Sequence, residues 1–199
     1  MHPIVPVQVW HKEGEKRVTT YALLDNGSSG CFLDEDIRKQ LGIDGTPTNF
    51  NLHTMHGMNA VESKAVTGLI VSDMKGENQI ELPRSFTRED IPVSHSQIPK
   101  ADALSDWPYL QEPLREMQPY MPDVQIGLLI GNNCQKALQP QKVIPAEGNG
   151  PFAIRYPLGW TINGPVCKGE QNASPLSCNR IHIRELESCT ETLLPKKYP

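Results

Sequence analysis

The sequence predicts a mainly β fold with one or two short helices. Residues Val5, Val7 and Val9 recur at every second position, which is the period of a half-buried strand. Residues 17–24 are rich in β-branched and aromatic side chains and end in an apolar run, as expected of a strand that enters a core. The 15 glycines and 18 prolines imply many turns, which suits a β-rich fold better than a helical bundle.

The remaining elements are predicted from local patterns. Residues 11–16, with Gly14 near the centre, form a hairpin turn between the first two strands. Residues 50–71 form a second hairpin, and its polar tip consists of Met55, His56, Gly57 and Met58. Further short strands are expected at residues 80–82, 124–130, 153–155 and 160–162.

One helix has both of its ends marked in the sequence. Asp34 is a suitable N-cap for a helix over residues 35–41, because its side chain can accept a hydrogen bond from a free backbone N–H. Gly42 is a suitable C-terminal stop, since glycine adopts the left-handed conformation that ends many helices. The apolar residues Leu33, Ile37 and Leu41 fall on one face.

The chain of 199 residues is long enough for one ordinary domain with tails. Residues 1–166 are expected to form that domain. Within it, residues 84–122 lose their periodicity and contain many prolines, which predicts a long insertion that is mobile or wraps the outside, with one turn of helix around Leu114. Residues 167–199 are polar and are interpreted as a linker or tail, in which residues 181–194 are the candidate helix.

Composition excludes several classes of function. The formal net charge is −4 and no long run of Lys or Arg occurs, so we expect no nucleic-acid partner for this domain. No apolar stretch approaches the roughly 20 residues that cross a bilayer, and the N-terminus lacks a signal-peptide pattern, so no membrane partner is expected. Five cysteines without paired short spacings fit a reduced, cytoplasmic chain.

The most informative motif follows the second strand, where Asp25, Asn26 and Gly27 precede Ser28 and Ser29. A buried strand there delivers one carboxylate to a sharp turn. Two carboxylates held about 3 Å apart share a proton, so that one acts as a base toward water while the other polarises a carbonyl. No second hydrophobic-hydrophobic-Asp-x-Gly sequence occurs in the chain, so the second carboxylate has to come from another copy in a homodimer. The alternative is that Asp25 simply belongs to a turn, since Asp-x-Gly is common.

A second signal favours the chemical interpretation. Residues 126–130 form an apolar strand that stops at Gly131 and Asn132. Other stretches follow the Asp25 motif in a characteristic order. They are residues 21–25, 27–29, 32–33, 41–42, 107–110, 123–124, 128–131, 150–153, 158–160 and 164–165. In order and spacing these stretches, over residues 5–166, resemble the aspartic proteases of BEL/Pao-type retrotransposons, which are retropepsin-like.

The resemblance implies a retropepsin-like acid-protease β-barrel that forms a homodimer and cuts a retrotransposon polyprotein in the cytoplasm, within virus-like particles. Asp25 matches the catalytic aspartate and Gly27 the glycine of the active-site triplet, with Asn26, Ser28 and Ser29 completing the loop. The resemblance further assigns a substrate-binding flap to Met55, His56, Gly57 and Met58, and a supporting strand to Ile130, Gly131 and Asn132. It implies hydrolysis of peptide bonds without a cofactor.

Two departures from the family pattern keep an alternative open. Asn26 stands where active retropepsins usually have Thr or Ser, whose hydroxyl bonds across the dimer. Ser29 and Asn132 stand where retroviral enzymes tend to carry an Asp and an Arg that pair with each other. The alternative is therefore a catalytically inactive, retropepsin-like module for dimerisation or interaction.

No metal site is predicted. His53 and His56 have no third or fourth ligand nearby in the sequence. The gaps between Cys167, Cys178, His182 and Cys189 match no compact zinc-binding pattern.

Overall fold

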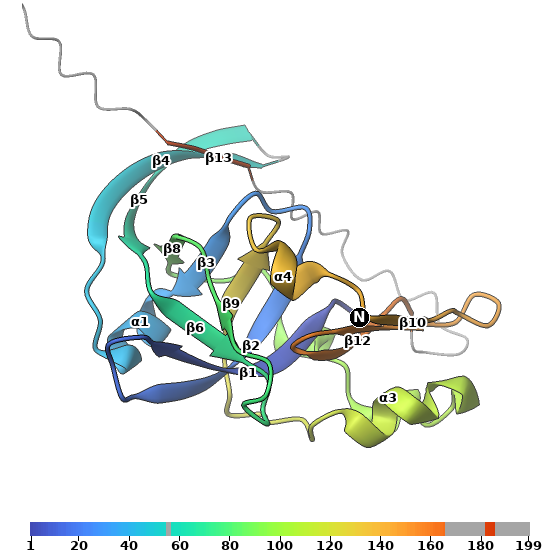
Figure 1. The fold of residues 1–199 in the computed structure, drawn as a ribbon. Coiled ribbons are helices and arrows are strands. Elements are labelled where there is room, and N and C mark those ends of the chain that lie inside the picture. The colour runs from blue at the N-terminus through green and yellow to red at the C-terminus, as the bar shows by residue number, and fades with distance from the viewer. Residues whose placement is uncertain (55–56, 166–181, 186–199) are drawn as a thin grey trace, which may run out of the picture.

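The computed structural model of the chain describes residues 1–54, 57–165 and 182–185. These residues are mainly β, which confirms the predicted class at that level. Ten strands form one sheet in the order β13-β4-β5-β8-β3-β9-β2-β1-β6-β7, and three form a second sheet in the order β10-β11-β12. Figure 1 shows β4, β5 and β13 arching over the upper left of the molecule, with the smaller sheet at the right and α3 below it.

The strands of the large sheet differ greatly in length. They are β1 (Ile4–His11), β2 (Arg17–Asp25), β3 (Cys31–Asp34), β4 (Thr46–Thr54), β5 (Gly57–Val66), β6 (Leu69–Ser72), β7 (Ile80–Glu81), β8 (Ser85–Arg88), β9 (Ile126–Gly131) and β13 (His182–Glu185). The small sheet consists of β10 (Lys142–Ile144), β11 (Phe152–Tyr156) and β12 (Gly159–Asn163).

The first two strands form the predicted antiparallel hairpin. Val5, Val7 and Val9 of β1 are fully buried, so the alternation in the sequence does mark the face that packs into the core. Strand β2 is buried from Val18 onward except at Thr19 and at its last residue, Asp25. It therefore carries a polar residue out of the core at its end.

Helix α1 (Glu35–Leu41) has the predicted bounds. The Asp34 side chain accepts a hydrogen bond from the backbone N–H of Asp36 at 2.8 Å, and Gly42 is left-handed with φ 69°. The Gly42 N–H reaches the carbonyls of Arg38 and Lys39. Both helix ends are thus encoded locally, which explains why the sequence predicts them.

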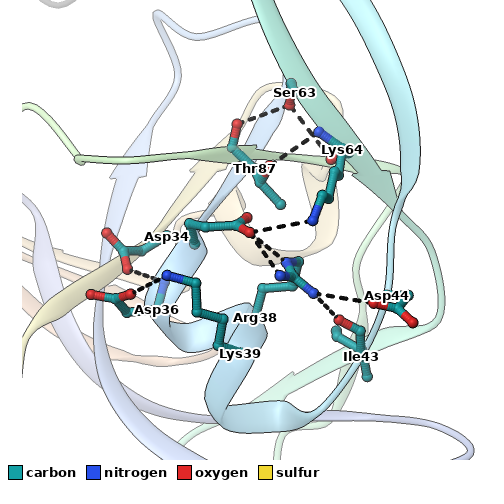
Figure 2. A network of polar contacts seen from close by, with 10 residues as sticks. Asp34, Asp36, Arg38, Lys39, Ile43, Asp44, Ser63, Lys64 and Thr87 are labelled. Carbon is teal, nitrogen blue, oxygen red and sulfur yellow. Dashed lines mark hydrogen bonds and ion pairs between the residues drawn. The ribbon is translucent and has the colours of Figure 1, made fainter.

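A polar network joins α1 to β5 and β8, as Figure 2 shows. The Arg38 side chain is only 9% exposed, and its Nε and Nη2 donate to Glu35 Oε1 at 2.9 and 2.7 Å. Arg38 Nη1 also donates to the carbonyl of Ile43. Lys64 lies 3.6 Å from the same Glu35 oxygen, and its backbone N–H donates to Thr87 Oγ1 at 3.0 Å. The network therefore fixes α1 against the hairpin base.

Strand β9 occupies the centre of the large sheet and is buried at every residue. It pairs in parallel with β2 and antiparallel with β3. A side chain at Gly127 would collide with Ile37 of α1 and would lie 2.8 Å from Thr20 Oγ1, so glycine allows α1 and β2 to close over this strand.

The structure contains more short helices than the one or two that the sequence predicts. The described residues contain four α-helices, α1, α2 (Ala101–Leu104), α3 (Gln111–Glu116) and α4 (Gln135–Leu138), besides the 3₁₀ turns η1 (His95–Gln97) and η2 (Pro108–Leu110). Helix α3 lies where one turn of helix is predicted around Leu114. Helices α2 and α4 are not predicted, because four residues are too few for a 3.6-residue periodicity to be visible in the sequence. Tertiary packing, rather than propensity, stabilises helices of this length.

The predicted insertion also begins later than expected. Strand β8 lies inside the large sheet between β5 and β3, although its residues fall within the range 84–122. After β8, Ile98, Leu104 and Leu110 are buried. The segment therefore contributes to the core instead of only wrapping the outside. The four-residue strand β8 cannot be recognised in the sequence, because its partner strands are distant along the chain.

The prediction for residues 167–199 can be compared with the structure only at residues 182–185. Residues 182–185 form β13, a strand, where the sequence suggested part of a helix. The rest of residues 167–199 lies outside the described residues, and the domain boundary at residue 166 stays a prediction.

We expect Arg38→Ala to lower the free energy of unfolding by about 2–3 kcal/mol, because it removes charge-assisted hydrogen bonds of a buried side chain. Chemical denaturation measures this change. Lys39→Ala is the matched control, since Lys39 is exposed and pairs with Asp36 on the helix surface. Equal effects of the two variants would contradict the role given to Arg38.

Candidate active site

Asp25 lies where two parallel strands of the sheet end side by side. In the register of β2 with β9, Asp25 is opposite Gly131. Because parallel strands present their carboxyl ends at one edge, the loop after β2 and the loop after β9 meet there. The structure therefore brings together the predicted catalytic residue and the predicted supporting strand.

The loop after Asp25 is organised by its own hydrogen bonds. The Gly27 N–H donates to Asp25 Oδ1 at 2.9 Å, and the Ser28 N–H donates to the Asp25 carbonyl at 3.2 Å. The Ser28 hydroxyl is fully buried and donates to the Gly30 carbonyl at 2.9 Å. Asn26 is exposed at the outside of the turn, and Ser29 is half-buried. The loop thus holds one carboxylate oxygen in a fixed direction.

Gly131 allows the two loops to touch. A Cβ atom at this position would collide with the Gly30 carbonyl and would lie 2.9 Å from the Ser28 carbonyl oxygen. The next residue, Asn132, donates its backbone N–H to that Ser28 oxygen at 2.7 Å. The backbone at the end of β9 therefore packs directly against the Asp25 loop and supports it.

The environment of Asp25 favours its protonated form. Burial raises the pKa of Asp25, while hydrogen bonds from Gly27 and Ser28 and the charge of His2 oppose the shift. The Oδ2 atom is buried and has no hydrogen-bond partner among the described residues. Because the folded-state pKa is raised, the carboxyl weakens the fold as pH rises from the ordinary aspartate value through the raised one.

His2 is a neighbour of Asp25 that the sequence reasoning missed. The Leu24 N–H donates to the Pro3 carbonyl at 2.9 Å, and the His2 N–H donates to the Gln97 carbonyl at 3.3 Å, which together hold the start of the chain beside the end of β2. Burial has the largest effect on the pKa of His2 and lowers it. The charge of the terminal ammonium lowers this pKa further, whereas the charge of Asp25 raises it. Extending the predicted pairing of the first two strands by two residues would have revealed this neighbour.

The predicted flap is described only in part. Strands β4 and β5 pair as far as Thr54 and Gly57, while Met55 and His56 lie outside the described residues. Gly57 has φ 125°, a conformation that favours glycine at the end of a hairpin turn. The Met58 side chain is 60% exposed. The hairpin exists as predicted, but its second strand ends at Val66, and β6 is separate and pairs with β1.

A cavity of about 90 Å³ lies elsewhere, and Asp25 does not line it. It is bounded by β1, the turn after β6, the segment before β9 and the turn between β11 and β12. Aromatic side chains of Tyr21, Tyr120 and Trp160 line it beside the Arg155–Glu116 ion pair. The cavity is therefore separate from the candidate catalytic loop.

Two cysteines flank the site but are unsuited to nucleophilic chemistry. Cys31 and Cys134 are free and buried. Burial raises the pKa of the Cys31 thiol to about 12, so that it is not ionised near neutral pH. The Cys31 thiol lies 3.1 Å from Asn133 Oδ1, to which it donates. In the described ranges, no three His, Cys, Asp or Glu side chains gather as metal ligands.

Comparison with protein-family models, with curated proteins and with solved structures gives no significant match to this chain. No helix in the described part of the chain has the length and apolar character needed to cross a membrane. Functional inference therefore depends on the geometry of the Asp25 loop and on the sequence motif that forms it.

We expect Gly131→Ala to lower the free energy of unfolding by about 1–3 kcal/mol, because the added methyl group meets backbone atoms that cannot rotate away. Thermal or chemical denaturation measures the loss. Gly14→Ala is the control, since a Cβ there would be 3.6 Å from its nearest neighbour. A stable Gly131→Ala variant would mean that the two loops are not in close contact.

We also expect reciprocal coupling between His2 and Asp25. In His2→Gln the pKa of Asp25 should rise further, because the charge that favours the carboxylate is lost. In Asp25→Asn the pKa of His2 should fall by an equal amount, as linkage requires. NMR titration of the two side chains in the two variants measures both shifts. Unchanged titration curves would show that the residues do not interact.

Proposed function

We propose that the chain is a retropepsin-like aspartic endopeptidase that acts as a homodimer and uses one Asp25 from each subunit. The observation that carries this proposal is the state of the Asp25 carboxyl group. One oxygen is fixed by the Gly27 N–H, while the other is buried without a partner among the described residues. A second carboxyl group brought to that oxygen would supply the missing hydrogen bond by sharing a proton.

The chemistry follows from a shared proton. Two neighbouring carboxyl groups cannot both ionise easily, so the pair holds one proton over a range of pH. The ionised member takes a proton from water, and the resulting nucleophile attacks the carbonyl carbon of a peptide bond. The protonated member donates a hydrogen bond to the carbonyl oxygen, which stabilises the negative charge that develops there. The tetrahedral intermediate then collapses: the C–N bond breaks, and the carboxyl group that took the proton from water gives it to the leaving amine nitrogen. No metal ion or organic cofactor takes part in this scheme.

The loop geometry supports the dimeric form of the proposal. A single chain contributes one such carboxylate, since the hydrophobic-hydrophobic-Asp-x-Gly sequence occurs once. The exposed Asn26 lies at the outside of the turn, where a second copy would approach. The proposed substrate is an extended polypeptide, and by the family resemblance it is a retrotransposon polyprotein processed in the cytoplasm within virus-like particles.

Asn26 is also the observation that favours a second candidate function. An amide is larger than the hydroxyl of Thr or Ser, and at a two-fold axis each copy would meet itself. If the amides held the loops apart, the carboxyl groups would be too distant to share a proton. The chain would then be an inactive dimerisation or interaction module with the same fold.

The decisive experiment compares the chain with Asp25→Asn in the cleavage of a peptide library at acidic pH. We expect the substitution to reduce cleavage by roughly three orders of magnitude or more, because in a homodimer it replaces both carboxyl groups of the pair that acts as a unit. Asp90→Asn is the matched control, since Asp90 is exposed and distant in sequence from the loop. Activity should also decline above neutral pH, where the pair loses its shared proton.

Peptide cleavage and pepstatin binding, measured on samples that sedimentation shows to be dimeric, separate the two candidates. A dimer that cleaves peptides and binds pepstatin supports the protease. A dimer that does neither supports the inactive module. Full cleavage by purified Asp25→Asn would overturn the proposed role of this residue.

A further inference from the structure

The strands at the two ends of the ten-stranded sheet differ in length and in whether another strand covers them. One end is β7, which has only two residues and therefore offers little unpaired backbone. At the other end β13 lies beside β4, which has nine residues. A long edge strand presents a row of free N–H and C=O groups that can pair with another strand. Without β13, β4 would therefore be the longer of the two terminal strands of the described sheet.

The outer half of the β4–β5 hairpin has little other support. Residues 57–60 of β5 are exposed, and β5 meets its next neighbour, β8, only at Ala65 and Val66. Beyond that point the hairpin is a two-stranded ribbon. An isolated two-stranded hairpin is marginally stable in water, whereas a third strand gives it independent stability.

Strand β13 supplies that third strand over part of the ribbon. It pairs antiparallel with β4, with His182 opposite His53, Ile183 opposite Leu52 and Glu185 opposite Phe50. Figure 1 shows it beside β4. Phe50 and Leu52 belong to the core cluster that also contains Phe32 and Phe86. The added strand therefore lies over the place where the hairpin is anchored to the core.

We propose that the outer edge of β4 is a strand-addition site for an extended polypeptide segment, and that residues 182–185 occupy it in cis as a strap on the hairpin. Recognition at such a site comes mainly from backbone hydrogen bonds, with alternate side chains adding specificity. The site takes an antiparallel strand of at least four residues that places an apolar residue opposite Leu52, as Ile183 does. Another polypeptide can enter only by displacing the strap.

The first test uses the full chain with Ile183→Pro and Arg184→Pro together. Proline has no N–H, and one of two consecutive residues in an antiparallel ladder donates to the partner strand, so the double substitution removes pairing whichever residue faces β4. We expect amide hydrogen exchange of residues 50–53 to become roughly tenfold faster or more. The matched control is Thr190→Pro with Glu191→Pro, which should exchange as the unmodified chain does. Unchanged exchange in the first variant would overturn the strap.

The second test asks whether the edge accepts a strand in trans. A labelled synthetic peptide with the sequence of residues 180–187 should bind the double-proline variant and restore protection at residues 50–53. It should bind the unmodified chain at least tenfold more weakly, because the strap already occupies the edge. Equal binding to both chains, or no binding to the variant, would overturn the strand-addition site. Exchange at β1 reports whether the variant remains folded.

Both tests measure pairing and not catalysis. They remain decisive if the chain proves to have no peptidase activity, so failure of the strap and failure of the proposed protease are distinguishable.

Discussion

The parallel pairing of β2 with β9 is the constraint on which the candidate site depends. Leu23 and Leu24 lie opposite Leu129 and Ile130, and all four side chains are buried. Their burial fixes the register, because a shift by one residue would turn each side chain to the other face of the sheet. The register in turn places Asp25 opposite Gly131. The polar loop therefore takes its position from apolar contacts beneath it.

The unpaired Asp25 oxygen is informative because other buried polar groups nearby are satisfied. Thr20, on the same strand, accepts from the Gly127 N–H and donates to the Gln125 carbonyl, both at 2.9 Å. Ser28 donates to Gly30 within the loop itself. Buried polar atoms in folded proteins are generally hydrogen-bonded, and an exception is often associated with function. Asp25 thus has a buried carboxyl oxygen without a partner among the described residues, and the proposed homodimer rests on this feature.

The features that the sequence predicts correctly are those encoded by neighbouring residues. Helix α1 has its cap residues Asp34 and Gly42 within one turn of its ends, and β1 shows its buried face as an alternation of valines. The Asp25 loop is recognised because a strand, a carboxylate and a glycine are adjacent. Strand β8 was missed because its position depends on β3 and β5, and no local pattern distinguishes its four residues from a loop.

The proximity of His2 to Asp25 was missed for a similar reason. It depends on where the chain turns before β1, and one hydrogen bond to Gln97 in the insertion helps to fix that position. The four-residue helices α2 and α4 likewise form where tertiary packing favours them. Local patterns therefore predict elements and a candidate residue, whereas the surroundings of that residue follow from long-range pairing.

The position of β9 has a consequence for how the chain folds. Gly127 and Thr20, which are hydrogen-bonded, are separated by 107 residues in the sequence. Contacts between distant residues require the closure of long loops, and proteins dominated by them fold slowly. The β1–β2 hairpin and α1 can form early from local contacts, but the Asp25 loop lacks its packing partner until β9 joins the sheet. During synthesis the carboxylate therefore remains outside its final environment until residues 126–131 have left the ribosome.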